Sequence, residues 1–164
     1  MHDWRKIIKA MVNFLDKNSA SVSISPMTHE DLLYLEKNLI TDFDDFWNFS
    51  ILAQEFSNDN TTYIVAKQNE QIVGFAGILT IIDEANIMNI VTKKDKRHLG
   101  IGSLLLKNLI NISMQKNLKS ITLEVNEHNI HAIKLYEKFN FNKIGIRKKY
   151  YNNTDSAIIM TLYI

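Results

Sequence analysis

The feature that most constrains the fold is a change of pattern near the middle of the chain. Residues 72–92 read as two apolar strands joined by the polar turn Asp83–Glu84, which is typical of an antiparallel hairpin. A loop with Gly100 and Gly102 then leads into a strongly apolar helix over 104–114, followed by a strand over 121–125. Strand, helix and strand in this order form a βαβ unit with parallel strands. The two patterns together predict an α/β (α+β) protein with one mixed sheet.

The other segments extend this sheet and cover it with helices. Val22 and Ile24 alternate with serines and predict a strand that Pro26 stops. Thr28 is predicted to cap a helix, with Asp31 completing a capping-box-like pattern. We further expect helices over 32–39, 46–56 and 129–138, a loop over 41–45, a strand over 63–67, and a last hairpin of 143–151 and 156–162 turned at Asn152–Asn153. The sheet is therefore expected to have seven strands, mostly antiparallel.

The first twenty residues form a separate segment in this interpretation. Trp4, Ile7, Ile8, Met11 and Leu15 recur at helical spacing and predict an amphipathic helix. Such a helix packs on its own domain or on a partner chain, and a basic one can also lie on a membrane. The start of the chain does not resemble a signal peptide. We expect a helical extension over residues 1–20 and one domain over 21–164.

Composition excludes several classes of function. The 164 residues contain 19 Lys and Arg against 18 Asp and Glu, so no overall basic field exists to hold nucleic acid or an anionic membrane. The absence of cysteine excludes a disulfide scaffold, a thiolate zinc site and a cysteine nucleophile. It fits a reducing cytoplasm. We expect no metal, no direct contact with nucleic acid and no membrane, and the sequence leaves the oligomeric state open.

The segment from Arg97 to Ser103 is suited to binding a pyrophosphate. Gly100 and Gly102 allow a ligand to approach the backbone closely, and the helix that follows presents unpaired N–H groups. A glycine pair before a helix is also common as a plain tight turn. The pattern is neither a P-loop nor a dinucleotide fingerprint, since no Gly-Lys-Ser/Thr follows and Leu105 stands at the third glycine.

A carboxylate and a phenol lie close to each other in the predicted fold. Glu124 is near the end of a predicted strand, and Tyr136 lies twelve residues later on the next helix. The two side chains can converge on one pocket as a base and an acid. The spacing of these two residues fits equally well a glutamate exposed to solvent and a tyrosine buried in the core. The pair Tyr150–Tyr151 is, by its position, more typical of a packed strand end than of a binding site.

The order of elements and three stretches of sequence resemble a known family. The order, with its Arg-x-x-Gly-x-Gly loop, is similar to that of the Gcn5-related N-acetyltransferases. Residues 83–90, 123–141 and 146–151 with 157–160 are similar to the bacterial ribosomal-protein-alanine N-acetyltransferases within it. The resemblance covers roughly residues 22–164, and its most specific parts are the stretch from Glu124 to Tyr136 and the paired tyrosines.

The resemblance implies the acyl-CoA N-acyltransferase fold and an activity. Acetyl-CoA would donate its acetyl group to the α-amine of a protein N-terminus, with a ribosomal small-subunit protein as the expected partner. Glu124 matches the general base and Tyr136 the general acid. The residues that match cofactor contacts are Ile90, Val91 and Thr92 for the acetyl and pantetheine, Arg97, His98, Leu99, Gly100, Ile101, Gly102 and Ser103 for the pyrophosphate, and Asn129.

The chain departs from the family pattern at several positions. His98 and Leu99 replace residues that usually bring more positive charge or glycine to the loop, and Thr92 replaces a usual Val. The loop over 41–48 lacks the usual Pro-Trp-Ser, and this loop helps to shape the acceptor site. Two alternatives therefore stay open, namely an acetyltransferase for a small amine or another protein, and a non-enzymatic acyl-CoA-binding module.

Overall fold

A seven-stranded sheet organises the part of the chain that the computed structural model describes, residues 22–43 and 48–164. The strand order is β1-β2-β3-β4-β5-β7-β6. β4 and β5 are parallel, and every other neighbouring pair is antiparallel, which confirms the predicted mixed sheet. The strands are β1 (Val22–Pro26), β2 (Thr61–Gln68), β3 (Gln71–Ile81), β4 (Glu84–Thr92), β5 (Ser120–Asn126), β6 (Asn142–Tyr151) and β7 (Asp155–Tyr163).

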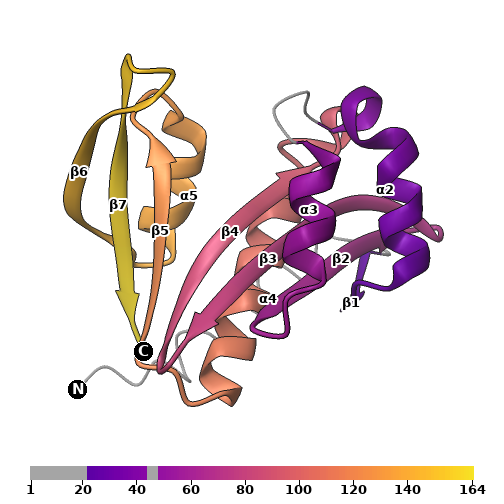
Figure 1. Ribbon diagram of the computed structural model, residues 1–164, viewed down its shortest axis with the longest axis horizontal. Coiled ribbons are helices and arrows are strands. Elements are labelled where there is room, and N and C mark those ends of the chain that lie inside the picture. The colour runs from indigo at the N-terminus through magenta and orange to yellow at the C-terminus, as the bar shows by residue number, and fades with distance from the viewer. Residues whose placement is uncertain (1–21, 44–47) are drawn as a thin grey trace.

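Helices cover the two faces of this sheet. Figure 1 shows α2 and α3 in front of β2 and β3, and α4 behind them. The alternation of side chains along β2 explains the arrangement, since Tyr63 and Val65 belong to the apolar cluster with α2 and α3, and Ile64 and Ala66 to the cluster with α4. The helices are α2 (His29–Asp42), α3 (Phe49–Phe56), α4 (Ile101–Gln115) and α5 (Ile130–Lys138), with a short 3₁₀ turn η1 (Lys94–Lys96).

The sheet divides between its two parallel strands. β4 and β5 are paired at three register positions at their starts, from Glu84–Ser120 to Asn86–Thr122. Beyond these positions the strands move apart (Figure 1), while β4 stays paired with β3 and β5 with β7. The edge of β4 that faces β5 therefore carries backbone N–H and C=O groups that the sheet does not use.

The cap predicted for the first helix is confirmed. Thr28 is the N-cap of α2, its Oγ1 accepts a hydrogen bond from the Asp31 N–H at 3.2 Å, and the Asp31 carboxylate accepts one from the Thr28 N–H at 2.9 Å. Lys67 of β2 forms an ion pair with Asp31 at 2.7 Å. The capping box therefore also ties α2 to the sheet.

Several predicted boundaries were wrong by a few residues. The helix α2 continues through Thr41 and Asp42 where a loop was expected, α4 begins three residues before Leu104, and Glu84 is the first residue of β4. Apolar periodicity marks the buried positions of an element but not its polar first and last turns, which explains these errors. The expected extension over 1–20, and Phe46 and Trp47 of the expected second helix, lie outside the described residues.

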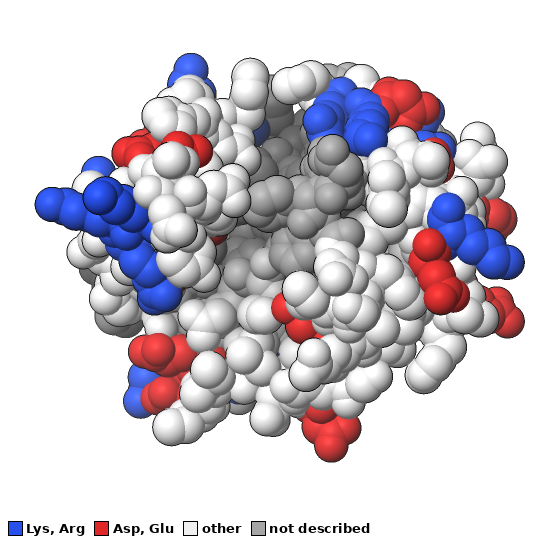
Figure 2. Space-filling model, turned by 45° about the horizontal axis from the view of Figure 1, so that its top comes forward, with Lys and Arg blue, Asp and Glu red and all other residues white. Residues whose placement is uncertain are grey.

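The surface carries both signs of charge. Figure 2 views the molecule with the top of Figure 1 turned forward. Lys and Arg gather at separate places around the rim, with Asp and Glu close to them. Across residues 22–43 and 48–164, none of the helices has the length and hydropathy needed to cross a membrane.

Candidate active site

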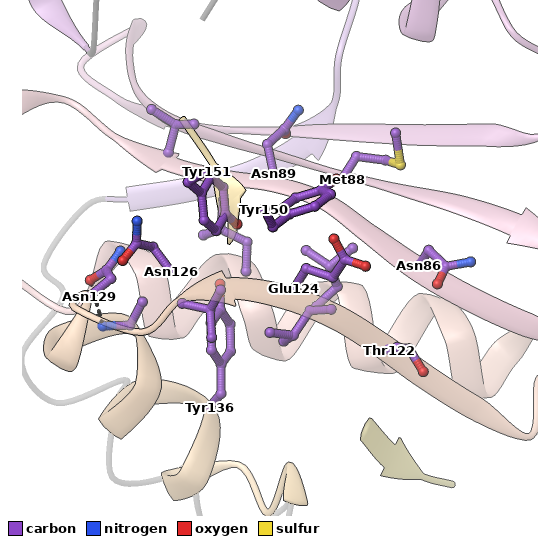
Figure 3. A pocket seen from close by; sticks show the side chains of 16 residues that line it. Asn86, Met88, Asn89, Thr122, Glu124, Asn126, Asn129, Tyr136, Tyr150 and Tyr151 are labelled. Atoms are coloured by element: carbon purple, nitrogen blue, oxygen red, sulfur yellow. Dashed lines mark hydrogen bonds between the residues drawn. The ribbon is translucent and has the colours of Figure 1, made fainter. Parts of the chain in front are cut away.

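A cavity of about 690 Å³ lies between β4 and β5. Residues from β4, β5, α5 and the end of β6 line it (Figure 3). Ile87, Ile90 and Val91 supply much of its apolar wall. Its polar lining residues are Asn86, Asn89, Thr122, Glu124, Asn126, Asn129, Tyr136, Tyr150 and Tyr151. A cavity in which polar side chains converge beside an apolar wall is suited to a small molecule or a cofactor.

Glu124 reaches the cavity from the face of the sheet that carries α2 and α3. Leu123 and Val125 of β5 are buried in the core with α4 and α5, so the alternation of the strand turns Glu124 to the opposite face. Its side chain is 27% exposed. The carboxylate is thus neither buried in the core nor fully solvated.

An arginine and two tyrosines surround Glu124. Arg147 Nη2 lies 2.9 Å from Glu124 Oε1, and the same guanidinium lies over the ring of Tyr150 at 4.9 Å. Tyr150 and Tyr151 pack edge to face with 5.0 Å between ring centroids. The register of β6 against β7 shifts between Arg147 and Tyr151, and Lys149 there has φ of 53°. This irregularity brings both tyrosines into the cavity wall.

Residue-based reasoning missed this group. It assigned the tyrosine pair to a packed strand end and did not select Arg147. No particular residue type marks a β-bulge, so the sequence of a strand with apolar and basic residues does not reveal one. The resemblance alone pointed to the paired tyrosines.

Tyr136 enters the cavity from α5, on the other side of β5. It is 9% exposed and packs near Phe141, with 5.8 Å between their ring centroids. Figure 3 shows its hydroxyl directed toward the cavity. Burial, with a smaller effect of Tyr151, raises the pKa of Tyr136 to about 12. The phenol therefore stays protonated at neutral pH and is able to donate a proton.

The loop before α4 has the geometry expected of an anion-binding helix start. His98 and Gly100 have positive φ of 62° and 86°, and Gly100 is the N-cap of α4 without a side chain to cap it. The first N–H groups of a helix have no partner within the helix and suit the phosphates of a ligand such as CoA. A Cβ built on Gly102 lies 3.9 Å from Thr92 Oγ1, so this helix start adjoins the end of β4.

The structure brings together part of the predicted set of residues. Glu124, Tyr136, Ile90, Val91 and Asn129 line the cavity. Thr92 and residues 97–103 are not among the lining residues and continue from the end of β4 into the start of α4. Arg97, His98 and Leu99 are exposed, whereas the side chain of Ile101 is buried in the core.

Asn129 has a structural contact that spacing did not predict. It is the N-cap of α5, and its Oδ1 accepts a hydrogen bond from the N–H of Ala132 at 3.1 Å (Figure 3). The amide nitrogen remains as the donor that this side chain offers a ligand. Among the described residues, no group of three or more acidic or His side chains is arranged to hold a metal ion.

Comparison with known proteins identifies the family. Residues 27–141 match the model of the acetyltransferase (GNAT) family, and the chain belongs to this family. It is 37% identical over 124 residues to the ribosomal protein bS18-alanine N-acetyltransferase of Haemophilus influenzae, covering 72% of this chain and 82% of that one. The protein is therefore an acetyltransferase that uses acetyl-CoA.

Solved structures agree with this assignment. The crystal structure of the ribosomal-protein-S18-alanine N-acetyltransferase from Escherichia coli has a TM-score of 0.80 and 30% identity, covering 87% of this chain and 94% of that one. A GNAT acetyltransferase from Elizabethkingia anophelis with acetyl-CoA bound has a TM-score of 0.71 and 22% identity, covering 89% of this chain and all of that one. The second similarity is one of fold.

Proposed function

We propose that this chain acetylates the α-amine of an N-terminal alanine, and that its acceptor is ribosomal protein bS18. The names of its relatives give the substrate class. The observation that carries the proposal is that Glu124 and Tyr136 reach one cavity from opposite faces of the parted sheet. This arrangement suits a thioester between two strands, attacked from one face and protonated from the other. Such an acceptor would place the reaction in the cytoplasm.

The base in this scheme is Glu124. Its Oε1 is engaged by Arg147, and its Oε2 takes the amine proton through a water molecule. An α-amine has a pKa of about 7.7–8.0 and a lysine about 10.4, so deprotonation of lysine costs about 3.5 kcal/mol more. Roughly a tenth of the α-amine is neutral at pH 7. A single carboxylate is thus better matched to an N-terminal amine than to lysine.

The acid is Tyr136. The neutral amine attacks the thioester carbon and forms a tetrahedral intermediate, whose oxyanion backbone N–H groups of β4 stabilise. The C–S bond then breaks and the leaving thiolate takes the phenol proton of Tyr136. The nitrogen gives up its remaining extra proton to solvent as the amide forms, and the phenolate of Tyr136 is protonated again from solvent. The chain has no cysteine, so we propose direct transfer in a ternary complex without a thioester acyl-enzyme.

The proposed cofactor contacts use the same gap between the strands. The acetyl and pantetheine would lie along Ile90, Val91 and Thr92, on the edge of β4 that the sheet leaves unpaired. The pyrophosphate would bind the backbone from Arg97 to Ser103, at the start of α4. The Asn129 amide nitrogen would donate to the same ligand.

A three-acceptor assay tests the proposal. The acceptors are a peptide with the N-terminal residues of bS18 and a free N-terminal alanine, the same peptide with a blocked N-terminus and an internal lysine, and spermidine. CoA release with the first acceptor alone is the expected result. Turnover of spermidine alone would indicate a small-amine acetyltransferase, and turnover of the blocked peptide alone would indicate a lysine acetyltransferase. Tight CoA binding without turnover of any acceptor would indicate a binding module.

We also propose the division into an extension over 1–20 and a domain over 21–164. The solved relative from Escherichia coli covers 87% of this chain, which supports a domain smaller than the whole. A chain that starts at Ser21 is expected to keep its acetyl-CoA affinity. Loss of folding in that chain would show that the first residues belong to the domain.

A further inference from the structure

Arg147 lies on the same face of the sheet as Glu124, two strands away. Glu124 of β5 is paired with Ile159 of β7. Arg147 of β6 is paired with Ala157, two residues before Ile159 on β7. Residues two apart on a strand point to one face, so Glu124 and Arg147 share that face. The small side chain of Ala157 leaves room for the guanidinium to reach the carboxylate, at 2.9 Å between Nη2 and Oε1.

An irregularity of β6 brings Tyr150 to the same guanidinium. In a regular strand, residues three apart point to opposite faces, so Arg147 and Tyr150 would not meet. The register of β6 shifts between Arg147 and Tyr151, and Lys149 there has a φ of 53°. Arg147 Cζ lies 4.9 Å from the centroid of the Tyr150 ring as a result. A guanidinium that lies over an aromatic face is restricted in its position and direction.

The carboxylate of Glu124 depends on Arg147 for its orientation. Across the described part of the chain, Arg147 is the one ion-pair or hydrogen-bond partner of this side chain. The described helices on this face, α2 and α3, lie over β2 and β3 and do not cover β5 (Figure 1). The Glu124 side chain is 27% exposed and has several rotatable bonds. Without a partner the carboxylate could therefore turn among several rotamers.

The contribution of this ion pair is to orientation more than to stability. Arg147 is 55% exposed, and ion pairs between exposed groups add little to the free energy of unfolding. A general base, in contrast, must lie within hydrogen-bond reach of the proton or of the water that carries it. A misplacement of about 1 Å costs about 100-fold in rate. With Oε1 bound to Arg147, Oε2 is the oxygen of Glu124 that remains for the acceptor.

We propose that Arg147 is a positioning residue that holds the Glu124 carboxylate in the orientation required of the base. Tyr150 restricts the guanidinium in turn. Arg147 itself neither gives nor takes a proton in the reaction. This inference rests on the proposed function and specifies how a partly exposed carboxylate stays directed at the acceptor amine.

A double-mutant cycle of Arg147→Gln and Glu124→Gln tests the proposal. Arg147→Gln alone is expected to lower kcat at least about 10-fold, because the base is no longer held in place. Its acceptor KM and its Kd for acetyl-CoA are expected to stay within about twofold of the wild type. Glu124→Gln has no base to position, so adding Arg147→Gln to it should change kcat by less than about twofold. An equal loss of kcat in both backgrounds would show a merely structural role and overturn the proposal.

Lys148→Gln is the matched control. Lys148 is the next residue of β6, is exposed, and loses the same charge in this variant. It is expected to keep the kcat and the acceptor KM of the wild type. Arg147→Lys keeps the charge but lacks the planar group that lies over Tyr150, so its kcat should lie between those of Arg147→Gln and the wild type. If Arg147→Gln does not fold, Arg147→Lys takes its place in the cycle.

The same kinetics separate a positioning role from a blocking one. Before it loses its proton, the acceptor amine is positively charged like Arg147, and both approach Glu124. An arginine that blocked the site would have to be displaced by the acceptor. Arg147→Gln would then lower the acceptor KM and leave kcat at or above that of the wild type, and this result would overturn the proposal.

The choice of acceptor keeps this test separate from that of the proposed function. The cycle is measured with whichever of the three acceptors the wild type acetylates. Turnover of spermidine alone rejects the proposed acceptor, and the cycle measured with spermidine still supports or rejects the role of Arg147. Turnover of the alanine peptide with an equal loss of kcat in both backgrounds rejects the role of Arg147 and leaves the proposed function intact. Absence of turnover with all three acceptors rejects both.

Discussion

At the scale of the residue, two ionisable groups in one cavity have different surroundings. Glu124 keeps partial contact with solvent and an ion pair with Arg147. Tyr136 is buried, and burial raises its pKa to about 12. A carboxylate that accepts from Arg147 and a phenol that keeps its proton are suited to act as base and acid at neutral pH. The same two residues could not be told from a solvated glutamate and a core tyrosine by spacing alone, because burial in a cavity wall is a property of the folded sheet.

Removal of the Tyr136 hydroxyl should slow the chemical step and leave acetyl-CoA binding unchanged. Tyr136→Phe keeps the ring in the core, so the fold and the acetyl-CoA affinity are expected to be unchanged. We expect kcat to fall about 100-fold or more, since general acid catalysis contributes about 10²–10⁴-fold. Stopped assays of CoA release and calorimetric titration with acetyl-CoA measure the two quantities. A rate equal to that of the wild type would remove Tyr136 from the mechanism.

The raised pKa of Tyr136 also predicts the alkaline limb of the pH profile. A general acid must be protonated, and the phenol loses its proton only as the pH passes its folded pKa of about 12. We therefore expect kcat to rise as the acceptor amine deprotonates and to show no decline due to Tyr136 below about pH 10. A decline between pH 8 and 9 that Tyr136→Phe abolishes would contradict this assignment.

At the scale of the element, local chemistry was predictable and tertiary irregularity was not. The capping box of Thr28 and Asp31 depends on neighbours within four residues, and the sequence revealed it. The bulge that turns Tyr150 and Tyr151 into the cavity depends on how β6 pairs with β7, and no residue type marks it. The sequence predicted that α4 begins later than it does, because its first turn carries glycine and serine instead of leucine.

The start of α4 provides a test of the cofactor site. A Cβ on Gly102 would be 3.6 Å from Leu135 Cδ2, an ordinary contact, so the fold should tolerate a side chain there. The same side chain stands between the helix N–H groups and a phosphate. We expect Gly102→Val to weaken acetyl-CoA binding by at least about 10-fold in calorimetric titration.

A glycine of β6 is the control for this variant. A Cβ on Gly145 would be 3.5 Å from Ile159 Cδ1, a contact similar to that at Gly102, and Gly145 lies on β6, far along the sheet from α4. Gly145→Ala is expected to bind acetyl-CoA as the wild type does. Equal affinity in Gly102→Val would refute the assignment of the phosphate site.

Asp31 should make the attachment of α2 sensitive to acid. Burial alone would raise the pKa of Asp31, but the hydrogen bonds from Lys67 and Thr28 outweigh it and hold the pKa below its ordinary value. A depressed folded pKa adds stability that is complete above the unfolded value of about 3.9 and is lost as the pH falls through the folded value. Asp31→Asn is expected to lower the free energy of unfolding at pH 7 by about 1–3 kcal/mol.

Urea unfolding at several pH values measures this effect. The difference between the wild type and Asp31→Asn should be constant above about pH 5 and shrink at lower pH, because the wild type then also loses the charge. Glu30→Gln changes an exposed acid in the same first turn of α2 and should have little effect. A difference that does not depend on pH would assign the loss to packing instead of charge.

At the scale of the whole molecule, the parting of the parallel strands creates the site. The sequence predicted the strands and the βαβ unit, but no residue pattern distinguishes two parallel strands that pair throughout from two that separate after three residues. The opening leaves one half of the molecule, β1 to β4, joined to the other, β5 to β7, by a short stretch of pairing and by the helices.

Acetyl-CoA bound in this gap should stabilise the junction of the two halves. A ligand at 100 times its Kd adds about 2.7 kcal/mol to the free energy of unfolding. For a chain of this size each kcal/mol raises Tm by about 2–4 °C, so we expect a rise of about 5–10 °C in differential scanning calorimetry. Hydrogen exchange should slow at the cavity-facing N–H groups of β4 from Ile87 to Thr92, which the sheet leaves unpaired.

The location of the slowed amides decides between a bridging ligand and one that binds a single half. A ligand held only at the start of α4 would protect that helix and leave β4 and β5 unchanged. Protection on both strands, absent in Gly102→Val at the same acetyl-CoA concentration, requires one molecule that joins the phosphate loop to the gap. Such protection would place the thioester beside β4, within the cavity that Glu124 and Tyr136 line.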